Sequence, residues 1–152
     1  HSGSIEYCHA CRIFGSSWRL SSVEFTDFTT SEGLKEYLRH YSLPLRTCVS
    51  LSRPLNVAEE QRLFIMETVP QEIESSALWF EGKIEGWLKE EDIGWLLAGL
   101  VTLTHVGGSK ARGLGRVKAS EMELELYDDQ TMRWHRSEWQ TVLRKTVPYG
   151  AT

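Results

Sequence analysis

VGGSKARGLGRV, residues 106–117, places four glycines and three cations between an apolar helical pattern and an alternating strand pattern. Glycine lacks a Cβ atom, so the main chain of such a loop can approach a phosphate closely, and successive N–H groups form a concavity that binds anions. The sequence therefore indicates a loop that binds a polyanion. A plain helix-to-strand turn on a solvated surface is the alternative, because glycine-rich turns are common.

Two common phosphate-binding motifs do not fit this loop. A Walker A loop requires G-x-x-x-x-G-K-[ST], but Leu114 and Gly115 stand where the lysine and the hydroxyl residue belong. A dinucleotide-binding fingerprint follows a strand and opens a helix, whereas this loop follows a helical pattern and precedes a strand. Neither kind of nucleotide site is therefore predicted here.

The loop resembles the glycine-rich loop of the RAMP superfamily, the RNA-binding subunits of CRISPR effector complexes, whose pattern is G-G-x-x-x-R-G-x-G-x-V. The matching residues are Gly107, Gly108, Arg112, Gly113, Gly115 and Val117. Two further stretches resemble the family in the same order along the chain. Residues 8–15, CHACRIFG, resemble its C-x-x-C-R-x-F-G element, and residues 46–70 resemble the thumb hairpin of type III backbone subunits.

Length and composition indicate a single domain. The chain has 152 residues, 41% of them hydrophobic, which suffices to bury a core. No apolar stretch is long enough to span a bilayer, and three cysteines, an odd number, do not form a secreted disulfide framework. We therefore expect a cytoplasmic protein with no membrane partner. The net charge of −4 argues against indiscriminate nucleic-acid binding, so RNA contacts must use a strip of the surface.

Hydrophobic patterning predicts both strands and helices. Strand patterns cover residues 18–28, 78–88 and 115–126, the last with a bulge near Ser120; helical patterns cover residues 33–41, 90–103 and 130–146; and residues 46–69 form two extended arms around a polar tip. The order strand, helix, glycine loop and strand is the closing half of a β-α-β-β-α-β fold. We therefore expect an α+β, ferredoxin-like (RNA-recognition-like) RAMP domain.

The opening half of that fold is expected to be missing. Family members begin with a strand and a basic helix before the cysteine element, whereas this chain begins at His1, a few residues before that element. Residues 1–152 thus resemble the C-terminal portion of a single, partial RAMP domain. A sheet without its first strand exposes an edge. An upstream segment of the same domain, or other RAMP subunits, should cover that edge.

The C-x-x-C spacing of Cys8 and Cys11 places two thiolates on one turn, as tetrahedral zinc requires. The resemblance implies a structural zinc in a knuckle-like element over residues 1–17, with Cys8 and Cys11 as ligands and His1 as a third. A redox C-x-x-C pair is the alternative, although no thioredoxin-like β-α-β context surrounds it.

The other histidines and cysteines are weaker candidates for ligands or catalysts. His9 is expected to be a surface residue, and Cys48 a small buried hydrophobe. His40, His105 and His135 have no carboxylate or nucleophile at a recognisable spacing, which leaves an acid–base ribonuclease unsupported. The family's metal-dependent aspartate lies in an N-terminal loop that this chain lacks, so no catalytic residue is assigned.

The resemblance implies RNA binding at two places. In the loop, cations contact phosphates while glycines permit backbone approach; the residues are Gly107, Gly108, Lys110, Arg112, Gly113, Gly115 and Arg116. In the thumb, an apolar tip wedges between bases and arginines neutralise phosphate; the residues are Arg53, Leu55 and Arg62. The tip departs from the family's R-x-T-G-x-A, and an ordinary exposed hairpin is the alternative.

These features imply a guide-RNA-binding structural subunit of a type III CRISPR interference complex, a ribonucleoprotein of antiviral defence. Its partners would be guide RNA, target RNA and neighbouring RAMP subunits. The alternatives are the end-capping subunit of the same complex and a RAMP endoribonuclease acting on guide or target RNA. Processing enzymes of the superfamily generally lack the C-x-x-C-R-x-F-G element and the long thumb, which favours the non-enzymatic role.

Overall fold

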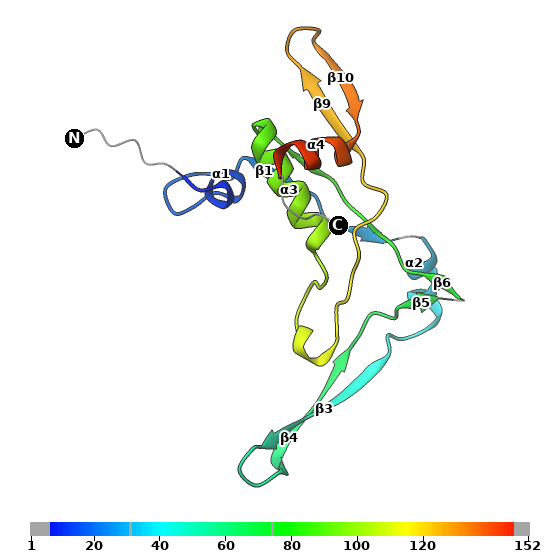
Figure 1. Ribbon diagram of the computed structural model, residues 1–152. Helices are drawn as coiled ribbons and strands as arrows, with labels where there is room; N and C mark the ends of the chain where they lie inside the picture. Colours follow the sequence, from blue (N-terminus) through cyan, green and yellow to red (C-terminus); the bar gives the residue numbers. More distant parts are fainter. Residues whose placement is uncertain (1–6, 31, 74, 148–152) are drawn as a thin grey trace, which may run out of the picture. The chain divides into compact units, whose positions relative to one another are not determined.

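The computed structural model describes residues 7–30, 32–73 and 75–147. The chain separates into two compact units, residues 1–24 with 84–152 and residues 25–83. Figure 1 labels most of their helices and strands. The described residues contain both helices and antiparallel strands, which confirms the α+β class. No helix in the described ranges is long and apolar enough to cross a membrane.

The core of the first unit lies between two helices, α3 (Glu90–Thr102) and α4 (Trp139–Thr146). Leu97 of α3 is buried against Val142 and Leu143 of α4, and half-buried apolar side chains surround them. The helices approach closely at Gly94, where an added Cβ would overlap the side chain of Thr146. Acidic side chains fill the first turn of α3, as the positive end of a helix dipole favours.

A short helix and a strand pair precede this core in the sequence and pack beside it. The helix α1 (His9–Phe14) contacts α3, and its Ile13 is buried. Strand β1 (Val23–Phe25) pairs with β8 (Ile84–Gly86), which leads directly into α3. Gly86 permits this close approach, because a Cβ there would overlap the carbonyl oxygen of Ser22.

The first unit also contains a hairpin of β9 (Leu124–Asp128) and β10 (Arg133–Ser137). Tyr127 and Trp134 face each other across the strands, with ring centroids 5.3 Å apart in an edge-to-face arrangement. Asp128 closes the turn by accepting hydrogen bonds from the Thr131 hydroxyl (2.7 Å) and the Gln130 N–H (2.9 Å). These bonds lower the pKa of Asp128.

The second unit is dominated by the long antiparallel hairpin of β3 (Leu45–Ser52) and β4 (Val57–Glu67). The smaller elements are β2 (Thr29–Thr30) paired with β7 (Phe80–Glu81), β5 (Glu72–Ile73) paired with β6 (Ser76–Ala77), and α2 (Glu32–His40). Leu34 of α2 is buried. The hairpin leaves large apolar side chains 61–72% exposed, namely Leu45, Leu51, Leu55, Leu63 and Ile65.

The predicted helices at 33–41 and 90–103 and the two arms at 46–69 are confirmed. Four predicted elements are partly wrong. The strand at 78–88 is broken into β7 and β8, the segment 115–126 becomes regular only from Leu124, and the first half of the helix at 130–146 is strand β10. The strand at 18–28 shrinks to β1, because a turn at residues 17–18, closed by a bridge between Ser16 and Arg19, lies where that strand was expected to begin.

The sheets formed by the described residues are all two-stranded. These residues therefore do not by themselves assemble the four-stranded sheet of a ferredoxin-like fold, because β1, β2, β7 and β8 are only two or three residues long. The α+β class agrees with the class predicted from the sequence, while the ferredoxin-like topology stays a prediction.

Candidate nucleic-acid interface

Residues 106–117 form a closed loop that follows α3 in the first unit. Two backbone hydrogen bonds close its base, from Val106 N–H to Gly115 O (2.8 Å) and from Val117 N–H to Thr104 O (2.9 Å). The residues between these bonds thus project as a single loop, so the predicted glycines and cations are presented together.

The glycines of this loop fall into two kinds. Gly107, Gly113 and Gly115 have φ values of +84°, +77° and +71°, a region that side chains with a Cβ rarely adopt. Gly115 is also tightly packed, because a Cβ there would overlap the carbonyl oxygen of Val106. At Gly108, by contrast, φ is not positive and an added Cβ would meet open space. The fold of the loop therefore requires a glycine at position 115 but not at position 108.

The cations of the loop lie on and next to a 3₁₀ turn, η1 (Lys110–Arg112). The side chains of Lys110, Arg112 and Arg116 are exposed. Lys110 and Arg116 form no ion pair with any described residue. Their charges are therefore not neutralised within that part of the chain and can act on an anion.

The second predicted RNA contact lies at the end of the β3–β4 hairpin. Arg53 and Leu55 belong to the turn between the strands, where Asn56 adopts a left-handed φ of +52°. Leu55 is 72% exposed, so folding does not require its apolar side chain. Arg62 lies on β4, with its Nε 3.1 Å from Oε2 of Glu59. The tip thus presents Arg53 and Leu55, whereas Glu59 partly neutralises Arg62.

Cys8 and Cys11 lie at the N-terminal end of α1 as free thiols. The Cys11 N–H donates to Cys8 Sγ (3.5 Å), which caps the helix and lowers the pKa of Cys8; the hydrogen bond with Cys8 raises the pKa of Cys11. Within the described ranges no three His, Cys, Asp or Glu residues come together as metal ligands. The two thiols fit half of a tetrahedral zinc site, and the predicted third ligand, His1, lies outside the described residues.

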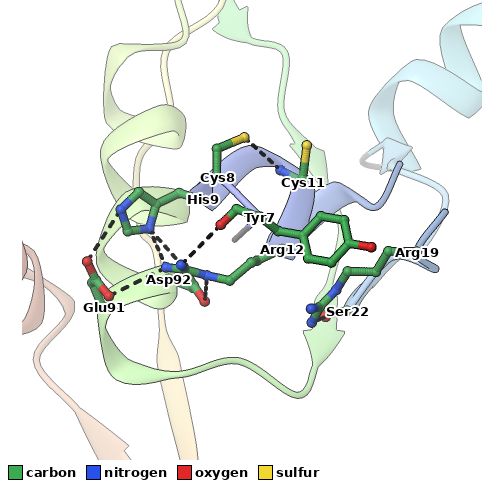
Figure 2. Close-up of polar contacts among 9 residues, drawn as sticks. All are labelled: Tyr7, Cys8, His9, Cys11, Arg12, Arg19, Ser22, Glu91 and Asp92. Atoms are coloured by element: carbon green, nitrogen blue, oxygen red, sulfur yellow. Dashed lines mark hydrogen bonds and ion pairs between the residues drawn. The ribbon is translucent and has the colours of Figure 1, made fainter. Parts of the chain in front are cut away.

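An ion cluster that the sequence did not predict joins α1 to α3 (Figure 2). Arg12 Nε lies 3.0 Å from each carboxylate oxygen of Asp92, and Arg12 Nη2 lies 2.6 Å from Oδ1. His9 Nδ1 lies 2.9 Å from the same oxygen, and His9 Nε2 lies 3.3 Å from Glu91. Asp92 is only 3% exposed, and the hydrogen bonds from Arg12 hold its pKa below the usual range.

His9, which the sequence indicated to be a surface residue, is half-exposed and takes part in this cluster. Its side chain is 34% exposed, and its ring lies 5.1 Å from the ring of Trp95, centroid to centroid. The available signal was the i, i+3 spacing of His9 and Arg12, which places both on one helix face opposite the acids at 90–92. The ion pairs of this cluster hold α1, which carries the cysteine element, against α3.

An α+β protein that presents glycines and unpaired cations in one exposed loop has the features of a nucleic-acid-binding protein. The model of the RAMP superfamily matches residues 2–118, and the chain belongs to this superfamily. Membership indicates a CRISPR-associated RNA-binding role, with RNA and other CRISPR-associated subunits as partners. No curated protein matches the chain significantly. The matched region includes the cysteine element, the hairpin and the glycine loop, while β9, β10 and α4 lie beyond it.

Proposed function

We propose that this chain is a guide-RNA-binding structural subunit of a type III CRISPR interference complex. The observation that carries the proposal is the loop at 106–117, where Lys110 and Arg116 lack carboxylate partners among the described residues and Gly108 faces open space. Membership of the RAMP superfamily supplies RNA as the class of ligand.

In this proposal the loop holds the phosphate backbone of the guide. Lys110, Arg112 and Arg116 supply positive charge, and main-chain N–H groups approach the phosphates where Gly107 and Gly108 have no side chain. Contacts to phosphate carry no sequence information. They suit a subunit that must accept any guide, because base pairing with the target supplies the specificity.

The tip of the β3–β4 hairpin acts as the thumb, a second contact on the RNA. Leu55 is exposed at the turn and wedges against bases of the guide–target duplex, while Arg53 neutralises a neighbouring phosphate. Arg62 contributes less than Arg53, because Glu59 lies 3.1 Å from its guanidinium. Cys8 and Cys11, with His1, hold a structural zinc that orders the N-terminal element.

The end-capping subunit of the same complex and a RAMP endoribonuclease are the alternatives. Two of the histidines that an acid–base nuclease would use have local partners: His40 Nε2 lies 2.9 Å from Glu36 Oε1 one turn earlier, and His105 Nδ1 lies 3.0 Å from Thr104 Oγ1. The carboxylate partner of His40 corrects the expectation that this histidine has none. A histidine beside one carboxylate is not a catalytic site by itself, and the structural role remains our proposal.

The test is RNA affinity as a function of salt, measured on the assembled effector complex with two guides of unrelated sequence. Lys110→Ala with Arg116→Ala should weaken both guides equally and lower the salt slope by about 0.7 for each lost single-strand phosphate contact. The matched control is Arg39→Ala with Lys145→Ala, which removes two exposed cations that already have acidic partners. Parent-like binding by the loop variant, or loss of one guide only, would contradict the proposal.

A further inference from the structure

A cleft of about 340 Å³ opens in the first unit, between the segment that precedes β1 and the start of α3. Its lining includes Arg12, Arg19, Ser22, Trp87, Lys89 and Asp92. Three cations and one carboxylate therefore face the same space. A volume of this size is typical of a site for a small ligand.

The charges in this cleft differ in how far they are already neutralised. Arg12 and Asp92 neutralise each other. Arg19 and Lys89, by contrast, form no ion pair with a residue that the structure describes. The neighbouring acid Glu91 is held by Arg12 and His9 in the same cluster. The cleft is therefore left with positive charge that points to an anionic ligand.

Arg19 is held in place for such a contact. Its guanidinium carbon lies 5.6 Å from the centroid of the Tyr7 ring, and its Nη2 lies 3.4 Å from the hydroxyl oxygen of Ser22. Figure 2 shows the side chain of Arg19 extending alongside the Tyr7 ring toward Ser22. A cation over an aromatic face has a restricted orientation, which reduces the entropy lost when an anion binds.

Trp87 supplies an aromatic face at the same place. Its backbone is fixed, because its N–H donates to Ser22 O (3.0 Å) and the preceding Gly86 packs against the same carbonyl group. Its side chain is nevertheless 84% exposed. The indole of Trp87 therefore contributes little to the fold. An exposed aromatic ring beside cations is the usual arrangement for stacking a nucleobase while its phosphate is neutralised.

We propose that this cleft binds one nucleotide of a single-stranded RNA, with the base stacked on Trp87 and the phosphate held by Arg19 and Lys89. The inference rests on RNA binding as the function of the chain, but it adds a contact that is separate from the loop at 106–117. The cleft lies at the β1–β8 pair and the start of α3, whereas the loop follows the end of α3.

The experiment uses the assembled complex and a short single-stranded RNA that carries 5-iodouridine. Irradiation should crosslink this RNA to Trp87, as mapped by mass spectrometry of the tryptic peptides. Trp87→Ala should remove that crosslink and lower RNA affinity by about fivefold or more, while Trp87→Phe should keep most of the affinity because a ring remains for stacking. Trp134→Ala, a matched change of an exposed tryptophan on β10, should behave like the parent.

The two cations proposed to hold the phosphate are tested separately from Trp87, so that the result does not depend on one substitution. Arg19→Ala and Lys89→Ala should each weaken RNA binding. Because the two cations hold one phosphate, the loss of both should lower the salt slope by about 0.7 in total. Parent-like affinity of both, together with a parent complex in which no crosslink maps to Trp87, would show that the cleft inference is wrong.

The two proposals of RNA contact can fail independently. If Lys110→Ala with Arg116→Ala weakens binding while the cleft variants bind like the parent, the loop proposal stands and the cleft proposal falls. If uridine monophosphate quenches Trp87 fluorescence but RNA affinity is unchanged in Trp87→Ala, the cleft takes a free nucleotide and the RNA contact proposed here is wrong. If the parent complex binds no RNA, both proposals are wrong.

Discussion

Arg12 and Asp92 are 80 residues apart in the sequence, yet Arg12 Nε lies 3.0 Å from both carboxylate oxygens of Asp92 and joins α1 to α3. Asp92 is 3% exposed, whereas the side chain of Arg12 is 26% exposed. A buried carboxylate remains ionised only where partners compensate for its lost hydration. The element that carries Cys8 and Cys11 is therefore positioned by a specific ion pair, in addition to the burial of Ile13.

Removing this carboxylate should destabilise the first unit. Asp92→Ala leaves the guanidinium of Arg12 with only the exposed Glu91, 3.4 Å away, and we expect a loss of about 2 kcal/mol in the free energy of unfolding. The expected loss is below that of a fully buried pair, because Arg12 reaches solvent. Urea unfolding measures it. The control is Arg39→Ala, which breaks the exposed pair with Glu36 and should change stability little; equal effects of the two changes would contradict the prediction.

The contribution of Asp92 to stability should also depend on pH. Because Arg12 lowers its pKa in the folded protein, the stabilisation is complete above the ordinary carboxyl pKa of about 3.9 and is lost as the pH falls through the lower, folded value. The difference in unfolding free energy between the parent and Asp92→Asn should therefore shrink below about pH 4. Asp128, whose pKa Thr131 also lowers, is present in both proteins and cancels. A difference that stays constant into that acidic range would contradict the prediction.

The sequence predicted those elements whose patterns are long and local. Helix α3 combines helical spacing with an acidic first turn, and the arms at 46–69 alternate on both sides of a turn. The strand prediction at 78–88 failed at Gly82, where an added Cβ would lie 2.9 Å from the ring of Phe28, a contact that depends on tertiary structure. The helix prediction at 130–146 failed because Met132, with a φ of +54°, belongs to a hairpin turn.

Some parts of the candidate site could likewise be predicted from the sequence, and others could not. The loop at 106–117 could be predicted because its glycines and cations are neighbours in the sequence. The Arg12–Asp92 pair could not, since it depends on how α1 packs on α3. The cleft around Trp87 likewise exists only because β1 pairs with β8. Long-range pairing of short strands leaves no periodic signal in the sequence that separates it from a turn.

The tip of the β3–β4 hairpin should matter for the guide–target duplex more than for the guide alone. Leu55→Ser removes the apolar side chain proposed to wedge between bases, and it should leave folding intact because Leu55 is 72% exposed. Leu63→Ser is the matched control, since Leu63 is 66% exposed on β4 but lies away from the tip. Affinity for duplex and single-stranded RNA, measured on the assembled complex, checks this. Equal losses in both variants would point to a general effect on the hairpin.

Metal content provides a separate test of the cysteine element. We expect about one zinc ion per chain in the purified complex, and its loss in Cys8→Ser with Cys11→Ser. The α3–α4 core should persist in that variant, because Leu97, Val142 and Leu143 lie outside the element. Cys48→Ser, a change of a free thiol on β3, should retain the zinc. Elemental analysis decides the matter: a metal-free parent, or zinc that survives the double change, would rule out these ligands.

Alanine substitutions in the loop at 106–117 should separate its structural glycine from one that serves RNA. Gly115→Ala should destabilise the loop most, because the added Cβ would overlap Val106 O and φ is +71°. Gly113→Ala has open space but a φ of +77°, so it should cost about 1 kcal/mol from backbone strain alone. Gly108→Ala has neither a clash nor a positive φ, and the free energy of unfolding should not fall.

The decisive comparison is therefore made at Gly108, where an effect on RNA cannot arise from misfolding. If main-chain groups of the loop lie against phosphates, the methyl group of Gly108→Ala should weaken RNA binding, while the stability measured by urea unfolding does not fall below the parent value. The charge of the loop is the same in both proteins, so the salt slope should also stay unchanged. Parent-like affinity of Gly108→Ala would mean that the RNA contacts only the long side chains of Lys110, Arg112 and Arg116, and that close backbone approach plays no part.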